Sequence, residues 1–113
     1  MDPNCIFCRI IAGEIPSTRV LETDRIVAFR DVNPQAPTHV LVVPRAHVAG
    51  FEQLAAGSPI WNALVAAAQD VARMEGLANG SRLVINQGRD GGQTVPHLHV
   101  HVLGGRPFRW PPG

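Results

Sequence analysis

Residues 97–103 read HLHVHVL, a run in which imidazole and aliphatic side chains alternate. Because successive side chains of a strand point to opposite faces of a sheet, this alternation predicts a strand with two different faces. Leu98, Val100 and Val102 would pack on a core, whereas three of the five histidines of the chain would project together from the other face. The chain must therefore fold so that its sheet has an apolar face and a face that holds clustered imidazoles.

The three clustered imidazoles are more than a polar surface requires. A single histidine on a sheet face is usually solvated, or partly buried and satisfied by hydrogen bonds. Crowded imidazoles instead suppress one another's protonation and lose solvation, which costs folding free energy. A metal site would use them, and so would a catalytic site that handles an anion, because neutral imidazole is both a metal ligand and a nucleophile toward phosphorus. The run alone leaves both interpretations open.

The loop NQGRDGGQT, which precedes the histidine run, fits the handling of an anion. Gly91 and Gly92 would let backbone amides approach an anion closely, and Asn86, Gln93 and Thr94 would add neutral donors. A glycine-rich loop alone is weak evidence, since most such loops only turn the chain, and Asn86 at a strand end also suits capping of the loop. Directly upstream of three histidines on one face, the loop predicts a phosphate cradle.

Apolar runs and turn residues elsewhere predict an α+β fold. Ser58 can cap a helix, Pro59 suits its first turn, and apolar residues recur on one helical face. The prolines of VNPQAP mark a loop, after which THVLVVP is typical of a buried strand. We expect one domain over residues 1–113, with a mainly antiparallel five-stranded sheet. The expected elements are a short helix over 8–15, a strand pair within 18–31, a strand over 38–44, a long helix from Ser58 to about Leu77, and strands over 82–88 and 97–103.

Length, charge and cysteine usage exclude several classes of protein. At 113 residues the chain is long enough for one hydrophobic core but not for two. Its ten basic residues are all arginines, scattered singly against nine acidic residues, so no basic face for nucleic acid or an anionic membrane is expected. We see no signal peptide, no apolar run that approaches a membrane span, and too few cysteines for a disulfide-stapled secreted fold. We expect a cytoplasmic protein with a small anionic partner.

The two cysteines, Cys5 and Cys8, form a CxxC pair near the N-terminus. Such a pair can be a redox motif, half of a metal site, or two inert buried thiols. Nothing around it indicates the βαβ unit that a thioredoxin-like motif requires. A zinc site would need two further ligands, and these would have to be histidines because the chain has no second cysteine pair.

Several blocks of the chain together resemble one family. The run HLHVHVL matches the His-φ-His-φ-His-φ-φ signature, with φ apolar, of the histidine triad (HIT) superfamily of nucleotide hydrolases and transferases. The blocks CIFCRIIAGEIPS, DVNPQAPTHVLVVPRAH, NQGRDGGQTVPHLHVHVLGGR and WPPG are similar to the Hint branch, the histidine triad nucleotide-binding proteins. The resemblance covers most of the chain. It implies the HIT fold, a homodimer, and hydrolysis of purine nucleoside phosphoramidates, which are AMP or GMP derivatives, without an organic cofactor.

The resemblance also implies roles for individual residues. His99 would attack the α-phosphate, His101 would contact the phosphate, and His39 would complete a proton relay near the leaving amine. The nucleotide would be bound by Asp31 at the ribose hydroxyls, by Asn86, Gly92 and Thr94 around the phosphate and leaving group, and by Ile6, Phe7, Ile10 and Phe29 around the purine. A structural zinc ion would be held by Cys5, Cys8, His47 and His97, as in some bacterial members.

Other functions are compatible with the same residues. A dinucleoside polyphosphate hydrolase or a nucleotidyl transferase of the same superfamily would use the same histidines, although the Hint-like ending and the short chain disfavour it. A non-catalytic nucleotide sensor or zinc-dependent interaction module would keep the site without turnover. Without the resemblance, Asp31 would be interpreted as a turn residue that opens a proline-rich loop.

Overall fold

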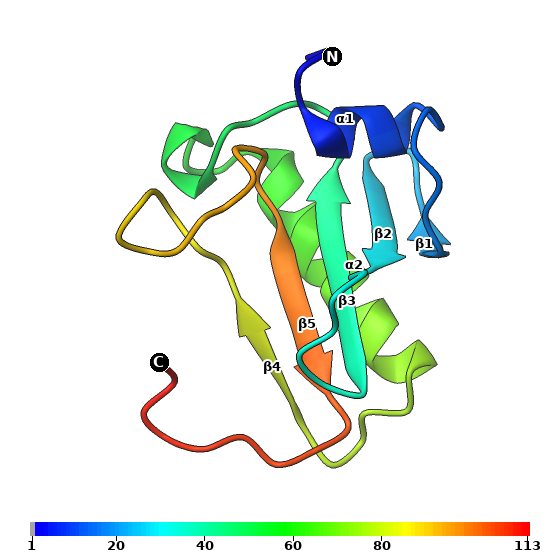
Figure 1. The fold of residues 1–113 in the computed structure, drawn as a ribbon, viewed down its shortest axis with the longest axis vertical. Coiled ribbons are helices and arrows are strands. Elements are labelled where there is room, and N and C mark those ends of the chain that lie inside the picture. The colour runs from blue at the N-terminus through cyan, green and yellow to red at the C-terminus, as the bar shows by residue number, and fades with distance from the viewer. Residues whose placement is uncertain (1) are drawn as a thin grey trace.

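In the computed structural model, which describes residues 2–113, five strands form one sheet in the order β1-β2-β3-β5-β4 (Figure 1). Every pairing between neighbouring strands is antiparallel, so the predicted α+β class with a five-stranded sheet is confirmed. Within the described residues, neither α-helix has the length and apolar character needed to cross a membrane. The elements are α1 (Ile6–Ile11), β1 (Arg19–Glu22), β2 (Ile26–Arg30), β3 (Thr38–Pro44), a 3-10 turn η1 (Phe51–Gln53), α2 (Pro59–Met74), β4 (Ser81–Val84) and β5 (Val100–Gly104).

The long helix α2 begins where the sequence predicts, because Ser58 caps it. The Ser58 hydroxyl accepts a hydrogen bond from the backbone N–H of Ile60, and Pro59 occupies the first turn. The helix ends at Met74, about three residues earlier than predicted. Gly76 follows with φ +70°, a left-handed conformation that glycine adopts without steric cost, and this turns the chain toward β4.

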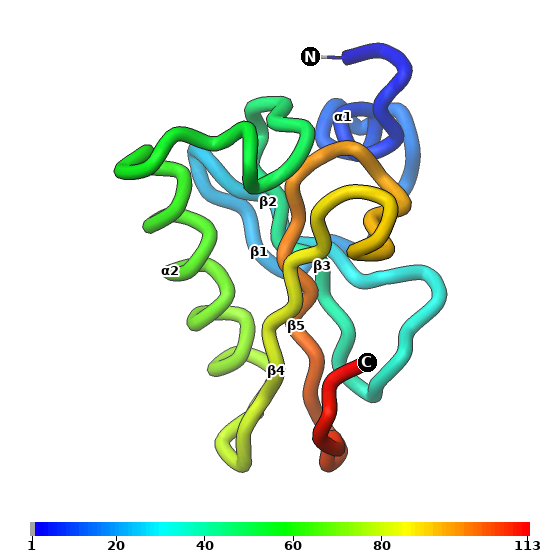
Figure 2. Tube along the Cα trace, turned by 90° about the vertical axis from the view of Figure 1, so that its left-hand side faces the viewer, coloured from blue at the N-terminus to red at the C-terminus, as the bar shows by residue number. Residues whose placement is uncertain are grey.

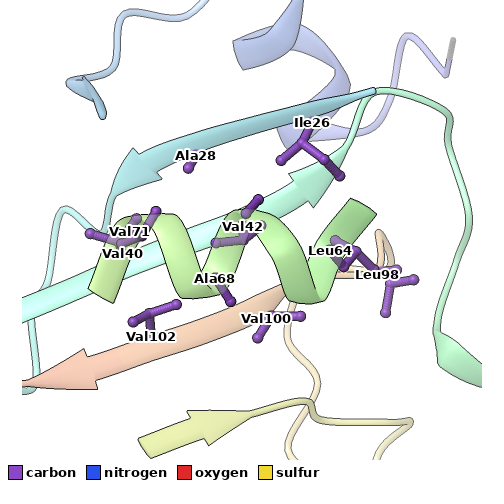
Figure 3. Close-up of a cluster of buried hydrophobic side chains, with 11 residues drawn as sticks. Ile26, Ala28, Val40, Val42, Leu64, Ala68, Val71, Leu98, Val100 and Val102 are labelled. Atoms are coloured by element: carbon purple, nitrogen blue, oxygen red, sulfur yellow. The ribbon is translucent and has the colours of Figure 1, made fainter. Parts of the chain in front are cut away.

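The centre of the sheet is covered on both faces, which explains why every residue of β3 is buried, whereas residues of the edge strands β1 and β4 are partly or fully exposed. Helix α2 covers one face, whereas α1 and the loop of residues 31–37 lie on the other side (Figure 2). The core between α2 and the sheet, shown in Figure 3, is apolar. It contains Ile26, Ala28, Val40, Val42, Leu64, Ala67, Ala68, Val71, Leu98, Val100 and Val102. A second, smaller core under α1 contains Cys5, Phe7, Cys8, Ile10, Val27, Phe29, Leu41 and Val43.

The predicted separation of the histidine run into two faces is observed, but the strand is shorter than predicted. Leu98 packs in the α2 core while the ring of His99 lies on the opposite side against Phe7. Strand β5 begins only at Val100, which pairs with Val42. Two residues further along β3 lies Pro44, which has no backbone N–H to extend the ladder with β5. Strand β4 ends at Val84, which pairs with His101, one residue inside the start of β5.

Candidate active site and metal site

Two cysteines and two histidines from distant parts of the chain converge where β3 ends and β5 begins, beside α1 (Figure 1). The ligand atoms of Cys5, Cys8, His47 and His97 all lie within 4.8 Å of one another. His97 Nδ1 is 3.4 Å from Cys5 Sγ and 3.2 Å from His47 Nδ1, and Cys8 Sγ is 3.4 Å from His47 Nδ1. Two sulfur and two nitrogen ligands at one point are the donor set of a closed, four-coordinate zinc site.

The hydrogen bonding of His97 fits this metal site. Its Nε2 lies 2.9 Å from the Pro44 carbonyl oxygen, which can only accept, so Nε2 carries the proton of the neutral ring. The lone pair is then on Nδ1, the atom that faces the two sulfurs. Burial lowers the pKa of His97 and raises that of the Cys5 thiol. A bound cation would reverse the second effect, because it stabilises the thiolate.

The neutral ring of His99 carries its lone pair on Nε2. Its Nδ1 is 2.7 Å from the backbone carbonyl oxygen of His97, so the neutral ring carries its proton on Nδ1. No hydrogen bond is found for Nε2 within residues 2–113. Burial lowers the pKa of His99, and its hydrogen bond to His97 partly opposes that shift. A neutral imidazole with one nitrogen fixed as a donor is the form that acts as a nucleophile.

His39 and His101 form a second imidazole system with a defined order of protons. The backbone N–H of Gln35 donates to His39 Nδ1 at 3.0 Å, so neutral His39 carries its proton on Nε2. That nitrogen lies 2.9 Å from His101 Nδ1, which must accept. Neutral His101 therefore carries its proton on Nε2, a buried atom that has no hydrogen-bond partner within the described part of the chain. A buried N–H without an acceptor is costly, and a bound oxyanion would satisfy it.

The pKa values of this pair agree with two neutral rings. Burial is the largest cause, and together with the neighbouring His99 and His39 it lowers the pKa of His101 to about 4, against the opposing effect of Asp31. Burial also lowers the pKa of His39, again opposed by Asp31. Both rings are therefore uncharged near pH 7. They offer a hydrogen-bond donor to a ligand without adding charge to a buried site.

Asp31 lies beside this pair, and its two carboxylate oxygens have different partners. Its Oδ1 accepts a hydrogen bond from the backbone N–H of Asn33 at 2.8 Å, so the turn interpretation is correct for one oxygen. Its Oδ2 lies 3.4 Å from His39 Nε2. Asp31, His39 and His101 also converge closely enough to hold a metal ion, but a proton lies between the two rings, so they do not offer a second open ligand set.

The glycine-rich loop connects β4 to the histidine run. Asn86 is half-buried just beyond β4, whereas Gly92 and Thr94 are exposed. The Gln93 side chain is engaged within the fold: its amide donates to the carbonyls of Ala49 and Val95, and its oxygen accepts from a backbone N–H in the loop. Contrary to the sequence interpretation, Gln93 stabilises the loop instead of offering a free donor to a ligand.

The four apolar residues predicted to surround a purine are placed unequally. Ile6 is 47% exposed, whereas Phe7, Ile10 and Phe29 are buried in the second core. The ring of Phe7 packs in a T-shaped arrangement with the His99 ring, at a centroid distance of 5.1 Å, and with the Phe29 ring, at 5.4 Å. Phe7 therefore packs against the imidazole of His99. The contacts predicted between a purine and these four apolar residues stay predictions.

Three groups that organise the site could not be predicted from sequence motifs, because they belong to the backbone. They are the N–H of Gln35 and the carbonyl oxygens of Pro44 and His97. Each fixes the proton of one imidazole, yet no side-chain type marks these positions. The only sequence signal is position, since Gln35 lies in the proline-rich loop and Pro44 ends the buried strand.

Comparisons with known proteins agree with this geometry. The HIT domain family model matches residues 12–108. A Zea mays protein named 14 kDa zinc-binding protein is 49% identical over 99% of this chain and 90% of its own length. The Arabidopsis thaliana adenylylsulfatase HINT1 is 47% identical over 99% of this chain and 78% of its own. The crystal structure of a HIT family hydrolase from Legionella pneumophila superposes with a TM-score of 0.94 at 47% identity, covering 97% of this chain and all of that one.

Proposed function

The chain belongs to the HIT family, and from this premise we propose that it hydrolyses purine nucleoside 5′-phosphoramidates through a nucleotidyl-histidine intermediate. One observation carries the proposal. The lone pair of His99 Nε2 and the unpartnered N–H of His101 belong to two rings whose centroids are 4.9 Å apart. A phosphoryl group placed there meets a nucleophile and a hydrogen-bond donor together.

The proposed reaction has two steps at phosphorus. In the first, the lone pair of His99 Nε2 forms a P–N bond, while the bond from phosphorus to the amine breaks and the amine leaves with the electron pair and takes up a proton from solvent. In the second, water attacks phosphorus and releases a proton to solvent, the bond to His99 breaks with its electron pair returning to Nε2, and AMP or GMP is released. The His101 N–H donates to a phosphoryl oxygen throughout. His39 contributes to the proposed relay through His101, because its Nε2 meets His101 Nδ1.

The remaining binding roles are proposals that rest on position. Asp31 Oδ2 would accept from the ribose hydroxyls, because the turn occupies only Oδ1 and His39 Nε2 lies 3.4 Å from Oδ2. Asn86, Gly92 and Thr94 lie on the loop that precedes the histidines and would face the phosphate and the leaving group. Ile6, Phe7, Ile10 and Phe29 lie on or under α1 and would form the purine wall.

Zinc is the metal that the Cys5, Cys8, His47 and His97 group fits, and one of the relatives is named for binding it. When bound, it would supply a four-coordinate link with no open position for substrate, which is a structural role. The ligands connect α1 to the chain that enters β5. The two free thiols also agree with a reducing, cytoplasmic location, which we propose as well.

Purified protein is expected to turn over an adenosine phosphoramidate that carries a fluorogenic amine. A guanosine phosphoramidate, adenylyl sulfate and a dinucleoside polyphosphate should be measured beside it, because one relative is an adenylylsulfatase. We expect the phosphoramidates to have the highest kcat/KM, since a basic amine can leave once protonated. Faster cleavage of adenylyl sulfate or of the dinucleotide would replace the proposed substrate. Tight AMP binding without turnover of any of the four would indicate a non-catalytic module.

We also propose that two copies pair through α2 and β4, as the resemblance implies. Strand β4 is an edge strand, and Leu83 on it is 49% exposed. Beside it, Val65 of α2 is 50% exposed, and a hollow of about 290 Å³ lies between the two elements. The hollow is lined by Trp61, Leu64, Val65, Ala68, Leu83, Ile85 and Val100. A second copy related by a two-fold axis would cover this surface and pair the free edge of β4.

Substitution Leu83→Asp is expected to convert the dimer to a monomer, because it places a charge in the apolar contact. Sedimentation velocity should show the wild type at twice the 12.2 kDa chain mass and the variant at the chain mass. Met74→Asp is the matched control: Met74 is 56% exposed on α2 but does not line the hollow, so this variant should stay dimeric. A monomeric wild type, or equal dissociation of both variants, would contradict this interface.

A further inference from the structure

The loop of residues 31–37 is held by the residues that follow β5, Gly105 and Arg106. Arg106 donates from Nη2 to the backbone carbonyl oxygen of Gln35 at 3.0 Å. Gly105 adopts φ +90°, and a Cβ built on it would lie 2.8 Å from Pro37 Cβ, so the two segments approach closely. The loop and the C-terminal tail lie on the same side of the sheet (Figure 2). Two contacts therefore fix where the Gln35 peptide lies.

Gln35 connects Arg106 to the imidazole pair through its two backbone groups. Its carbonyl accepts from Arg106, while its N–H donates to His39 Nδ1 at 3.0 Å. His39 Nε2 in turn meets His101 Nδ1 at 2.9 Å. Because an N–H can only donate, the location of the Gln35 peptide determines which nitrogen of His39 carries the proton, and through it which nitrogen of His101 does.

Arg106 is itself held in place for this contact. Its Nη1 donates to the carbonyl of Pro107, and its Cζ lies 4.3 Å from the centroid of the Phe108 ring. No carboxylate within residues 2–113 forms an ion pair with Arg106. The N–H groups of its guanidinium donate to backbone carbonyls, so they can hold a peptide group in place.

We propose that Arg106 is a positioning residue for the imidazole pair. It holds the Gln35 peptide so that His39 keeps its proton on Nε2 and His101 presents its N–H toward the bound phosphoryl group. The catalytic effect rests on the proposed function, whereas the effect on the tautomers does not. Without Arg106, the Gln35 N–H would move relative to His39, and the other tautomer, which turns the His101 proton inward, would be populated.

Arg82 provides a matched control within the same chain. Its guanidinium Cζ lies 5.0 Å from the centroid of the same Phe108 ring, and its Nη2 donates to the backbone carbonyl of Arg109 at 2.9 Å. It therefore supports the same tail by the same two kinds of contact, but it has no hydrogen bond to the 31–37 loop. Arg82→Met and Arg106→Met each keep an unbranched apolar stem and remove all donors.

The decisive measurement is the histidine tautomer in protein labelled with ¹⁵N-histidine, read from long-range ¹H–¹⁵N correlations. Wild type and Arg82→Met should show His39 and His101 protonated on Nε2, and Arg106→Met should show a mixture for both rings. With the phosphoramidate substrate, Arg106→Met should lose about tenfold in kcat with little change in KM, less than the roughly 100-fold or more that a general acid itself contributes. Arg106→Lys, whose ammonium can donate to the same carbonyl, should recover most of both signals.

Unchanged tautomers and kcat in Arg106→Met would overturn the proposal. Equal losses in Arg82→Met and Arg106→Met would overturn it too, because general support of the tail would then explain the effect. If the wild type cleaves no nucleotide, the proposed function fails, while the tautomer spectra still decide the role of Arg106.

Discussion

Replacing His99 with alanine is expected to lower turnover of an adenosine phosphoramidate by about 10⁴-fold or more while AMP binding is retained. The reason is the loss of the Nε2 lone pair, the only imidazole nitrogen of this cluster that is fixed as unprotonated and free of a partner in residues 2–113. Single-turnover rates measure the chemical step. Intact mass after rapid mixing should show a transient nucleotidyl adduct in the wild type and none in His99→Ala.

The control for this prediction is His101→Asn. It removes the N–H that faces the phosphoryl group but keeps the His99 nucleophile, so the adduct should still form, more slowly, and peptide mapping should locate it on His99. Equal turnover of His99→Ala and wild type would remove His99 from the mechanism. An adduct on any other residue would do the same, even if the protein remained an efficient hydrolase.

Periodicity was enough to predict the architecture that carries these residues. The alternation of HLHVHVL placed Leu98, Val100 and Val102 in the α2 core, and Ser58 marked the start of α2. The bounds of β4 and β5 could not be predicted, because they depend on each other. Strand β5 begins at Val100 opposite Val42, although β3 itself continues to Pro44, and β4 ends at Val84 opposite His101. Strand ends are a property of pairs, whereas sequence patterns describe one strand at a time.

The convergence of Cys5, Cys8, His47 and His97 was predicted by the family resemblance, and the structure brings the four together. The unequal roles proposed for the three histidines in the run required the structure. Their side chains are identical, and the difference is which backbone group each ring meets: the Pro44 carbonyl for His97, and the His97 carbonyl for His99. His101 instead meets a ring, His39. Nothing in a side-chain pattern records these partners.

Removal of zinc is expected to destabilise the protein by several kcal/mol. A metal present at about 1,000 times its Kd stabilises the folded state by about 4 kcal/mol, which corresponds to a Tm shift of about 10 to 20 °C for a chain of this size. The site lies between α1 and the start of β5, so its loss removes a link that holds α1 against the rest of the second core. Thermal unfolding of metal-loaded and chelator-treated wild type measures the shift, and metal analysis gives the occupancy.

The variant Cys8→Ser separates the metal from ordinary packing. Cys8 is 2% exposed, so serine also buries a hydroxyl, and the variant alone would confuse the two effects. The chelator resolves them: it should lower the Tm of the wild type but leave Cys8→Ser unchanged. Cobalt substitution should give the visible spectrum of a tetrahedral site with sulfur ligands in the wild type only. Less than about half an equivalent of zinc in the wild type, unchanged in Cys8→Ser, would leave both cysteines as core residues. In that case His97 would position His99 only through its backbone carbonyl, and no metal ion would hold the His97 ring.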